Sequence, residues 1–240
     1  MSGHDLILAA IAVPLLGAFL IGVTGRRPDL REAVTLTSAV ILFLVVLALL
    51  TLFLNGWVLE TAAIDLVPGV PLAFRLEPLG MIFAVVASGL WIVNSIYSIG
   101  YMRANNEAKQ TRFYVCFALA LASTIGVAFA GNLLTLFVFY EALSLTTYPL
   151  VVHHEDEEAK RAGRTYLGLL MATSIGLLLF AILLTWEEAG TLDFTEGGIL
   201  EGQVADGLAS LLLLLYMYGV GKAALMPVHR WLPAAMVAPT

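Results

Sequence analysis

The stretch that decides the fold is Asn132 to Val152, with the sequence NLLTLFVFYEALSLTTYPLVV. It contains a single charged residue, Glu141, near its middle. A helix of this length, at ~1.5 Å per residue, spans the ~30 Å hydrocarbon core of a lipid bilayer. Glu141 then lies about 14 Å from either surface, where a carboxylate costs at least ~2.5 kcal/mol. A charge that is so unfavourable in the membrane marks a candidate functional residue.

A second charge lies in another apolar stretch. Lys222 is the only charged residue between Leu208 and Met226, and Pro227 follows. A span that is interrupted by proline beside a cation is typical of discontinuous transporter helices, whose freed backbone groups line a polar cavity. Each residue also has its own alternative: Lys222 could snorkel to the inner membrane interface, and Glu141 could be a structural carboxylate that hydrogen-bonds a neighbouring helix. One acid and one base, each alone in its span, suggest a buried titratable pair.

The composition indicates a membrane protein. The 240 residues are 60% hydrophobic and 12% charged, with a mean hydropathy of +0.92, whereas soluble domains have ~25% charged residues. The basic residues are scattered over short loops, which argues against a nucleic-acid partner. We find no phosphate-binding glycine loop, haem ligand pair or catalytic triad. The sequence therefore predicts an all-α polytopic membrane protein without a cofactor and without catalysis by this chain alone.

Seven stretches are apolar enough to be transmembrane helices. They are residues 6–23, 33–54, 78–99, 113–130, 132–152, 165–186, and a seventh that begins near 208 and is broken at Pro227. Residues 55–77 are too polar to span a membrane, and β-forming residues flank the pair Pro68-Gly69. This pattern predicts a small β-hairpin outside the membrane, between the second and third helices.

The basic residues predict the orientation of these helices. The six loops contain, in order, 3, 1, 3, 0, 3 and 0 lysines plus arginines. By the positive-inside rule the N-terminus is outside, and the first, third and fifth loops are cytoplasmic. The hairpin and the acidic loop at 187–207 are then external. His153 and His154 lie at the cytoplasmic end of the helix that carries Glu141.

Polar side chains near the two charges are candidates for a proton path. They are Ser144, Thr147, Tyr148, His153, His154 and His229. The alternatives are ordinary interhelical hydrogen bonds for the hydroxyl groups and solvated interfacial positions for the histidines. Residues 153–158 include types that bind metals, but they lack the ligand spacing of a metal site. We therefore predict no bound metal.

The motifs around both charges resemble those of a known family. Residues 139–144 with Tyr148, and residues 221–227 running into 231–236 and 238–240, look like the antiporter-like subunits. These are the proton-translocating subunits of respiratory complex I, membrane-bound hydrogenases and Mrp-type cation/proton antiporters. Residues 148–153 look closest to the Mrp-type or hydrogenase-type members. By this resemblance Glu141 corresponds to the family's helix-five glutamate and Lys222 to its lysine on the broken seventh helix.

The resemblance also implies a domain organisation. Family members have about fourteen helices, built around two inverted repeats of five. Residues 1–112 are then the first three helices with the hairpin at about 55–77, and residues 113–240 are an incomplete first repeat. The chain stops where the eighth helix is expected, so we expect an N-terminal half. It is a truncated chain, a fragment or a naturally split subunit.

The implied function is transport. The chain is expected to be a multi-pass subunit of the cell membrane, the inner membrane in a bacterium with two. It carries protons, in exchange for Na⁺ or another monovalent cation such as K⁺, through Glu141 and Lys222. Its partners are other membrane subunits, including one that supplies the second half if the chain is split. The alternatives are a proton-pumping subunit of a redox-driven complex and a structural subunit with a degenerate channel.

Overall fold

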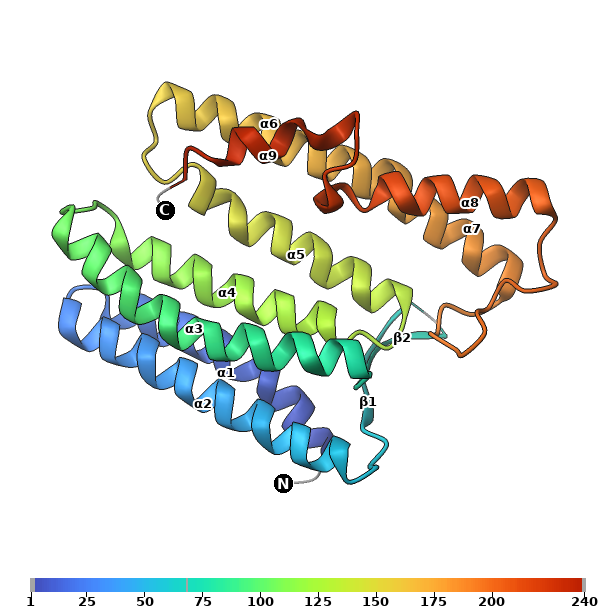
Figure 1. Cartoon of the computed structure of the whole chain (residues 1–240), viewed down its shortest axis with the longest axis horizontal. Helices are drawn as coiled ribbons and strands as arrows, with labels where there is room; N and C mark the ends of the chain where they lie inside the picture. Colours follow the sequence, from blue (N-terminus) through green and yellow to red (C-terminus); the bar gives the residue numbers. More distant parts are fainter. Residues whose placement is uncertain (1–2, 68, 239–240) are drawn as a thin grey trace. The chain divides into compact units, whose positions relative to one another are not determined.

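The computed structural model describes residues 3–67 and 69–238, most of which are helical (Figure 1). Pro68 of the predicted turn, and Pro239 and Thr240 of the C-terminal motif, lie outside these residues. The elements are α1 (Gly3–Thr24), α2 (Pro28–Leu54), β1 (Glu60–Val67), β2 (Val70–Arg75), α3 (Pro78–Ala104), α4 (Gln110–Ala128), α5 (Leu133–Val151), α6 (Glu157–Thr173), the π-helix η1 (Ser174–Leu178), α7 (Leu179–Ala189), α8 (Asp206–Gly219), the 3₁₀ turns η2 (Gly221–Ala223) and η3 (Val228–Arg230), and α9 (Trp231–Ala235).

The helices confirm a multi-pass membrane protein. Within the described residues, six helical segments are long and apolar enough to cross a bilayer, and α6, η1 and α7 together form one of them. The seventh, α8, has 14 residues and reaches about 21 Å, so it crosses only part of the hydrocarbon. It is the first piece of the predicted broken helix. The small hairpin of β1 and β2 also forms where the sequence predicts it.

The largest differences from the predicted starts are in α2 and α6, whose additional first residues include charged side chains. α2 starts at Pro28 rather than at residue 33, and α6 starts at Glu157 rather than at residue 165. Proline suits the first turn of a helix because its missing N–H needs no partner there. The Asp156 side chain caps α6 by accepting a 2.7 Å hydrogen bond from the Ala159 N–H. Hydropathy finds the apolar part of a span and misses such polar ends.

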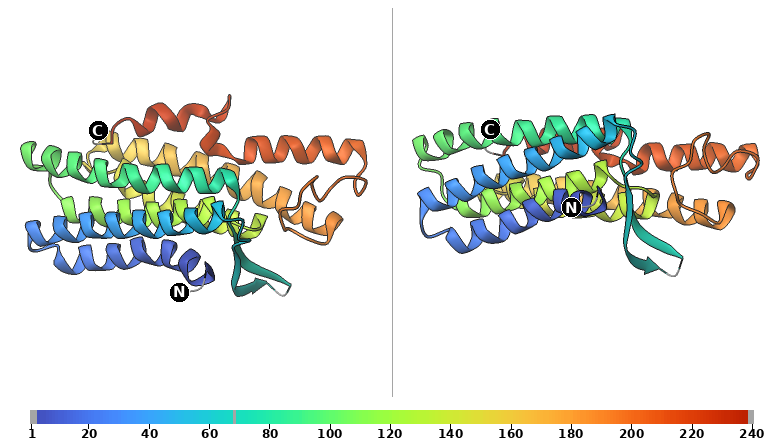
Figure 2. Two further views of the ribbon diagram at one scale, coloured as in Figure 1. Left: turned by 60° about the horizontal axis from the view of Figure 1, so that its bottom comes forward. Right: turned by 90° about the horizontal axis from the view of Figure 1, so that it is seen from below.

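The chain divides into two compact units. Unit 1 comprises Met1–Thr61 and Phe74–Ala130, and unit 2 comprises Ala62–Ala73 and Gly131–Thr240. In unit 1, α1 packs against α2 and α4, and α3 packs against α2 and α4 (Figure 2). Ile7, Leu42 and Ile125 are fully buried in this bundle. Unit 1 is thus a four-helix bundle with an aliphatic core.

One end of unit 1 holds a network of paired charges, which we call the Arg31 cluster (Asp29, Arg31, Glu32, Arg103 and Gln110). The Arg103 guanidinium donates to both Glu32 oxygens, from Nε at 3.0 Å and from Nη2 at 2.6 Å. Arg31 donates to the Gln110 side chain at 2.7 Å and contacts Glu32 at 3.4 Å. Arg31 is 4% exposed and Glu32 is 6% exposed. The cluster therefore ties α2 to α3 and α4 by charge-assisted hydrogen bonds.

Unit 2 contains α5 to α9 and the tip of the hairpin. α6 packs against α5 and α9, and α8 packs against η1 and α7. The chain runs along α7 as α8, breaks, and continues beside α6 as α9 (Figure 1). The start of α5 pairs with the hairpin tip through Gly131 N–H to the Ala73 carbonyl, and with the acidic loop through Phe194 N–H to the Gly131 carbonyl. The hairpin tip and the acidic loop therefore meet at one end of α5.

Candidate functional site

The helix α5 is fixed at its first turn, which determines where Glu141 lies. Asn132 caps the helix by accepting from the Thr135 N–H at 2.8 Å, and its amide donates to the Pro71 carbonyl at 2.8 Å. The Thr135 hydroxyl accepts from the Ala73 N–H at 2.9 Å. Asn132 and Thr135 are fully buried. The hairpin tip thus anchors the end of the helix from which Tyr140, Glu141 and Ser144 project.

Lys222 lies where the seventh span is not helical. α8 ends at Gly219, before Pro227, and the chain then makes the 3₁₀ turn η2, which is followed by Ala224 with a φ of +52°. Gly219 packs against the π-helix so closely that a Cβ there would lie 2.6 Å from the Leu178 backbone nitrogen. Gly221 similarly contacts the Thr173 side chain. The break therefore begins at Val220, before Pro227, between two glycines that let the backbone approach α6 and η1.

The side chain of Lys222 is held by α5. Its ammonium donates to the Ser144 hydroxyl and to the Tyr140 carbonyl, the latter at 3.4 Å. The same nitrogen lies 3.9 Å from the centroid of the Tyr140 ring, which is a cation–π contact. Ser144 is fully buried and Tyr140 is 5% exposed. The ammonium is thus surrounded by neutral acceptors and an aromatic face.

Glu141 follows Tyr140 in the chain and has a different environment. Both carboxylate oxygens are buried, and neither has a hydrogen-bond partner among the described residues. In particular, no hydrogen bond joins Glu141 to Lys222, although Glu141 is the neighbour of Tyr140 in the chain and Lys222 contacts Tyr140. The structure brings the two predicted residues to one site without bonding them directly. A buried carboxylate without a partner is costly unless it is neutral or a cation approaches it.

The other predicted hydroxyl groups continue along α5. Thr147 shares a 2.6 Å hydrogen bond with the Tyr166 hydroxyl of α6. Tyr148 packs against a buried cluster that contains Val151, Tyr166 and Leu170. Ser144 and Thr147 therefore lie on a line of polar groups that starts at Lys222 and runs toward the end of α5. Tyr148 borders this line within the apolar cluster.

The predicted histidines lie in different places. His153, at the end of α5, is 4% exposed, and its ring stands 5.7 Å from the exposed His154 in an edge-to-face contact. His229 lies in η3, where its Nδ1 atom is buried and has no hydrogen-bond partner among the described residues. The groups that hydrogen-bond the Lys222 ammonium belong instead to Tyr140 and Ser144. Within the part of the chain that the structure describes, no group of His, Cys, Asp and Glu has the arrangement of a metal site.

Three aromatic residues around Lys222 were not predicted as site residues. They are Tyr140, Tyr166 and Trp231, of which Trp231 packs edge-to-face on Tyr166 with 5.7 Å between ring centroids. The Trp231 indole donates to the Gly221 carbonyl at 2.8 Å. These contacts join residues far apart in sequence, so spacing could not reveal them. The sequence contains a signal only for Tyr140, which precedes Glu141, and for Trp231, which follows the break.

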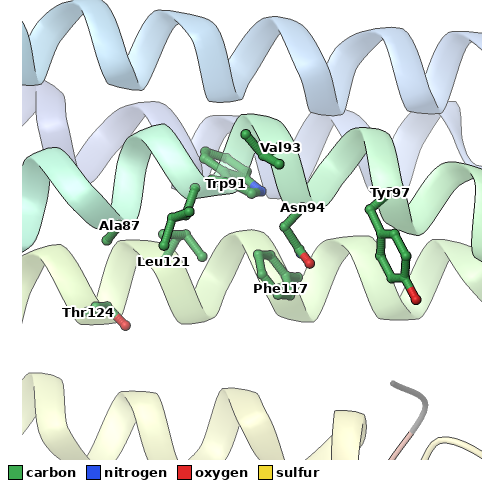
Figure 3. A pocket seen from close by; sticks show the side chains of 9 residues that line it. Ala87, Trp91, Val93, Asn94, Tyr97, Phe117, Leu121 and Thr124 are labelled. Atoms are coloured by element: carbon green, nitrogen blue, oxygen red, sulfur yellow. The ribbon is translucent and has the colours of Figure 1, made fainter.

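The pocket between α3 and α4 of unit 1 is of another kind. It has a volume of about 610 Å³ and is lined mainly by apolar side chains, among them Trp91, Phe117 and Leu121 (Figure 3). Its polar side chains are Asn94, Thr124 and the Tyr97 hydroxyl, and no charged residue lines it. Its lining therefore contains no carboxylate, lysine or histidine, in contrast to the site at Lys222.

Two family descriptions match the chain. Residues 130–240, which include all of the predicted site residues, match "NADH:quinone oxidoreductase/Mrp antiporter, TM". Residues 68–114 match "NADH-Ubiquinone oxidoreductase (complex I), chain 5 N-terminus". The first match covers both the break in the seventh span and the whole of α5.

Curated relatives agree with this family. The chain is 33% identical over 165 residues to "Hydrogenase-4 component B" of Escherichia coli (strain K12), which covers 68% of the chain and 24% of that protein. It is 28% identical over 211 residues to a Na⁺/H⁺ antiporter subunit of Alkalihalophilus pseudofirmus, covering 85% of the chain and 26% of that protein. The chain thus spans about a quarter of the length of these relatives.

A solved structure shows the same fold. A chain of the membrane-bound sulfane sulfur reductase, described as an archaeal respiratory membrane complex, superposes with a TM-score of 0.84. The match covers 97% of this chain and 48% of the other, at 22% sequence identity. The two family matches, over residues 68–114 and 130–240, and the relative that is 33% identical show that the chain belongs to the family of antiporter-like membrane subunits of complex I, hydrogenases and Mrp antiporters.

Proposed function

We propose that the chain is a membrane subunit of a multi-subunit ion-translocating complex and that Glu141 and Lys222 carry protons through it. The observation that carries this proposal is the pair itself. One base lies on a break between two helical pieces, and one acid without a hydrogen-bond partner among the described residues lies beside it on α5. Ionisable residues within membrane-spanning segments are rare and often mark proton relays.

The geometry supports a simple transfer mechanism. The Lys222 ammonium now contacts neutral oxygens of Tyr140 and Ser144, and the Glu141 carboxyl group is free to accept a cation. If Lys222 turns toward Glu141, the opposite charge favours the protonated amine. If Glu141 instead pairs with another cation, burial favours the neutral amine, and Lys222 releases its proton. Ser144 and Thr147 then provide hydroxyl groups on which water or a proton can be relayed along α5.

We further propose that the proton is exchanged for Na⁺, K⁺ or another monovalent cation, which makes the chain part of a secondary antiporter. Relatives named as Na⁺/H⁺ and K⁺/H⁺ antiporter subunits support this. Residues 113–240 would be the first part of an antiporter-like repeat that follows the helices of residues 1–112. The partners would be other membrane subunits of one complex, including a source of the second repeat if the chain is naturally split.

The proposed setting is the cell membrane, with the N-terminus outside. The distribution of basic residues over the loops supports this orientation. The packing in unit 2 supports it too, because the hairpin tip and the acidic loop, both expected outside, meet at the same end of α5. His153 and His154 would then lie at the cytoplasmic mouth of the path.

A proton pump within a redox-driven complex is the second candidate. It is favoured by the relatives named as hydrogenase-4 component B and as subunit L of an NADH-quinone oxidoreductase, both from Escherichia coli. The same pair would move protons, and the driving force would come from partner subunits instead of a cation gradient. Transport that persists in the absence of Na⁺ and K⁺ but requires electron transfer would select this candidate.

The proposal is tested by Glu141→Ala in the assembled complex. Proton transport is measured in inverted vesicles by the quenching of a pH-sensitive dye. We expect its rate to fall at least about tenfold while insertion and assembly stay normal, because the proton can no longer be transferred through the Glu141 carboxyl group. Glu187→Ala, which removes an exposed carboxylate from the last turn of α7, is the matched control and should transport normally. Normal transport by assembled Glu141→Ala would contradict the proposal.

A further inference from the structure

The peptide unit between Gly221 and Lys222 is held by side chains at both of its polar atoms. Its N–H, which belongs to Lys222, donates to the Tyr140 hydroxyl at 2.9 Å. Its carbonyl, which belongs to Gly221, accepts from the Trp231 indole at 2.8 Å and from the Ala224 N–H at 3.0 Å. Tyr140 comes from α5 and Trp231 from α9. Side chains from two different helices, α5 and α9, therefore hydrogen-bond the same peptide.

These two side-chain hydrogen bonds replace backbone hydrogen bonds that a continuous helix would make at this peptide. In a continuous helix the Lys222 N–H would donate to the carbonyl of Tyr218, one turn earlier. Non-helical backbone at membrane depth is tolerated only where other groups satisfy it. Tyr140 and Trp231 supply those groups, and both are themselves fixed: Tyr140 is 5% exposed, and Trp231 packs on Tyr166.

Tyr140 also contacts the charge that the peptide carries. Its ring lies 3.9 Å from the Lys222 ammonium, and its carbonyl accepts from that ammonium at 3.4 Å. The negative face of an aromatic ring attracts an ammonium ion but gives a neutral amine no comparable stabilisation. One side chain thus holds the Lys222 backbone in place and favours one protonation state of its side chain.

We infer that Tyr140 and Trp231 are positioning residues that clamp the Gly221–Lys222 peptide, and that the Tyr140 ring sets the pH range over which Lys222 stays protonated. The inference rests on the proposed role of Lys222. The elements that contact η2 or the Lys222 side chain carry other titratable groups: Glu141 on α5, Tyr166 on α6, and His229 and Arg230 on η3. The charged residues of α6 all lie at 157–164, before the turns that contact Gly221.

Three variants, studied in the whole complex, separate the positioning of the Gly221–Lys222 peptide from the effect of the Tyr140 ring on the Lys222 ammonium. Tyr140→Phe keeps the ring and removes only the hydroxyl, and Trp231→Phe keeps an aromatic ring and removes the N–H. We expect each to slow transport about tenfold or more with an unchanged pH profile. Tyr140→Phe removes the acceptor of the Lys222 N–H, and Trp231→Phe leaves the Gly221 carbonyl with the Ala224 N–H alone, so each loosens the peptide that carries the Lys222 side chain. Tyr140→Leu removes ring and hydroxyl together. We expect the alkaline limb of its transport profile to move about 0.5–1 pH unit lower, because the ammonium loses its aromatic face.

Tyr216 provides the matched control, since its hydroxyl shares a 2.7 Å hydrogen bond with Thr185 in the same unit rather than with the Lys222 peptide. Tyr216→Phe and Tyr216→Leu should keep both the rate and the pH profile. If Tyr140→Leu does not assemble, Tyr140→Met serves in its place. A wild-type rate in Tyr140→Phe and Trp231→Phe overturns the clamp, and an unshifted profile in assembled Tyr140→Leu, or an equal shift in Tyr216→Leu, overturns the role of the ring.

The outcomes also separate this inference from the proposed function. If Glu141→Ala transports normally, the proposed function fails and the inference falls with it. If Glu141→Ala is inactive while the Tyr140 and Trp231 variants match the wild type in rate and profile, Lys222 still carries protons, and only the positioning role is wrong.

Discussion

The Arg31 cluster in unit 1 and the Glu141–Lys222 site in unit 2 both contain buried ionisable groups, but the partners of these groups differ. In the cluster, Glu32 accepts two hydrogen bonds from Arg103, and Arg31 reaches Glu32 and Gln110. In unit 2, Lys222 donates to neutral acceptors, and Glu141 has no hydrogen-bond partner among the described residues. The hydrogen bonds of the Arg31 cluster stabilise the charged forms of its residues. The site in unit 2 leaves Glu141 and Lys222 able to change their protonation states.

The comparison separates a structural role of buried charges from a functional one. A salt bridge with several hydrogen bonds compensates the cost of burial, so it holds helices together and has little reason to release a proton. A lone acid beside a lone base keeps part of that cost uncompensated. Its protonation then responds to any charge that approaches, which is what a relay requires.

The largest effect on stability is expected for Glu32→Leu. It removes the shared acceptor of Arg31 and Arg103 and leaves the buried Arg31 uncompensated, so the complex should lose about 3 kcal/mol of stability. Thermal unfolding of the detergent-solubilised complex measures this. The molecules that do assemble should transport at the wild-type rate. A normal melting temperature would show that the cluster does not hold the helices together.

A smaller and opposite effect is expected for Glu141→Gln. The amide has the same shape as the carboxyl group but carries no charge, so the variant avoids the cost of burying an unpartnered carboxylate. The same unfolding measurement should show stability equal to the wild type or about 1 kcal/mol higher, although transport is lost. A loss of stability like that of Glu32→Leu would mean that Glu141 is a structural residue.

The smallest effect is expected for Glu60→Gln at the base of the hairpin. Glu60 pairs with Arg75 at 3.3 Å, but both side chains are substantially exposed. Exposed ion pairs contribute less than about 1 kcal/mol and are screened by salt. Unfolding and transport should both stay close to the wild type. A marked loss of stability would show that ion pairs matter in this protein regardless of burial.

The sequence predicted the membrane spans, and it singled out Glu141 and Lys222 as candidate functional residues, for the same physical reason. Burying a charge in hydrocarbon is so unfavourable that Glu141 and Lys222 stand out from their apolar neighbours. Hydropathy failed where charges lie at helix ends, so the first turns of α2 and α6 were missed, and with them the position of Arg31 and Glu32 inside a helix. The break in the seventh span was placed at Pro227, whereas α8 ends at Gly219.

The contacts of the site could not be predicted in the same way. Tyr140 and Lys222 are 82 residues apart, and no periodicity relates positions on different helices. Tyr140 and Trp231 hydrogen-bond the Gly221–Lys222 peptide only because the fold brings α5, η2 and α9 together. The roles of His153, His154 and His229 stay predictions, since the described contacts do not join them to Lys222.

The most direct measurement of the central claim compares Lys222→Arg with Lys222→Ala in the assembled complex. Arginine keeps the positive charge but effectively never releases a proton. If Lys222 carries protons, Lys222→Arg should block transport in inverted vesicles almost as severely as Lys222→Ala, with normal assembly of both variants checked first. Wild-type transport in Lys222→Arg together with loss in Lys222→Ala would contradict the account, because Lys222 would then be a fixed counter-charge near Glu141.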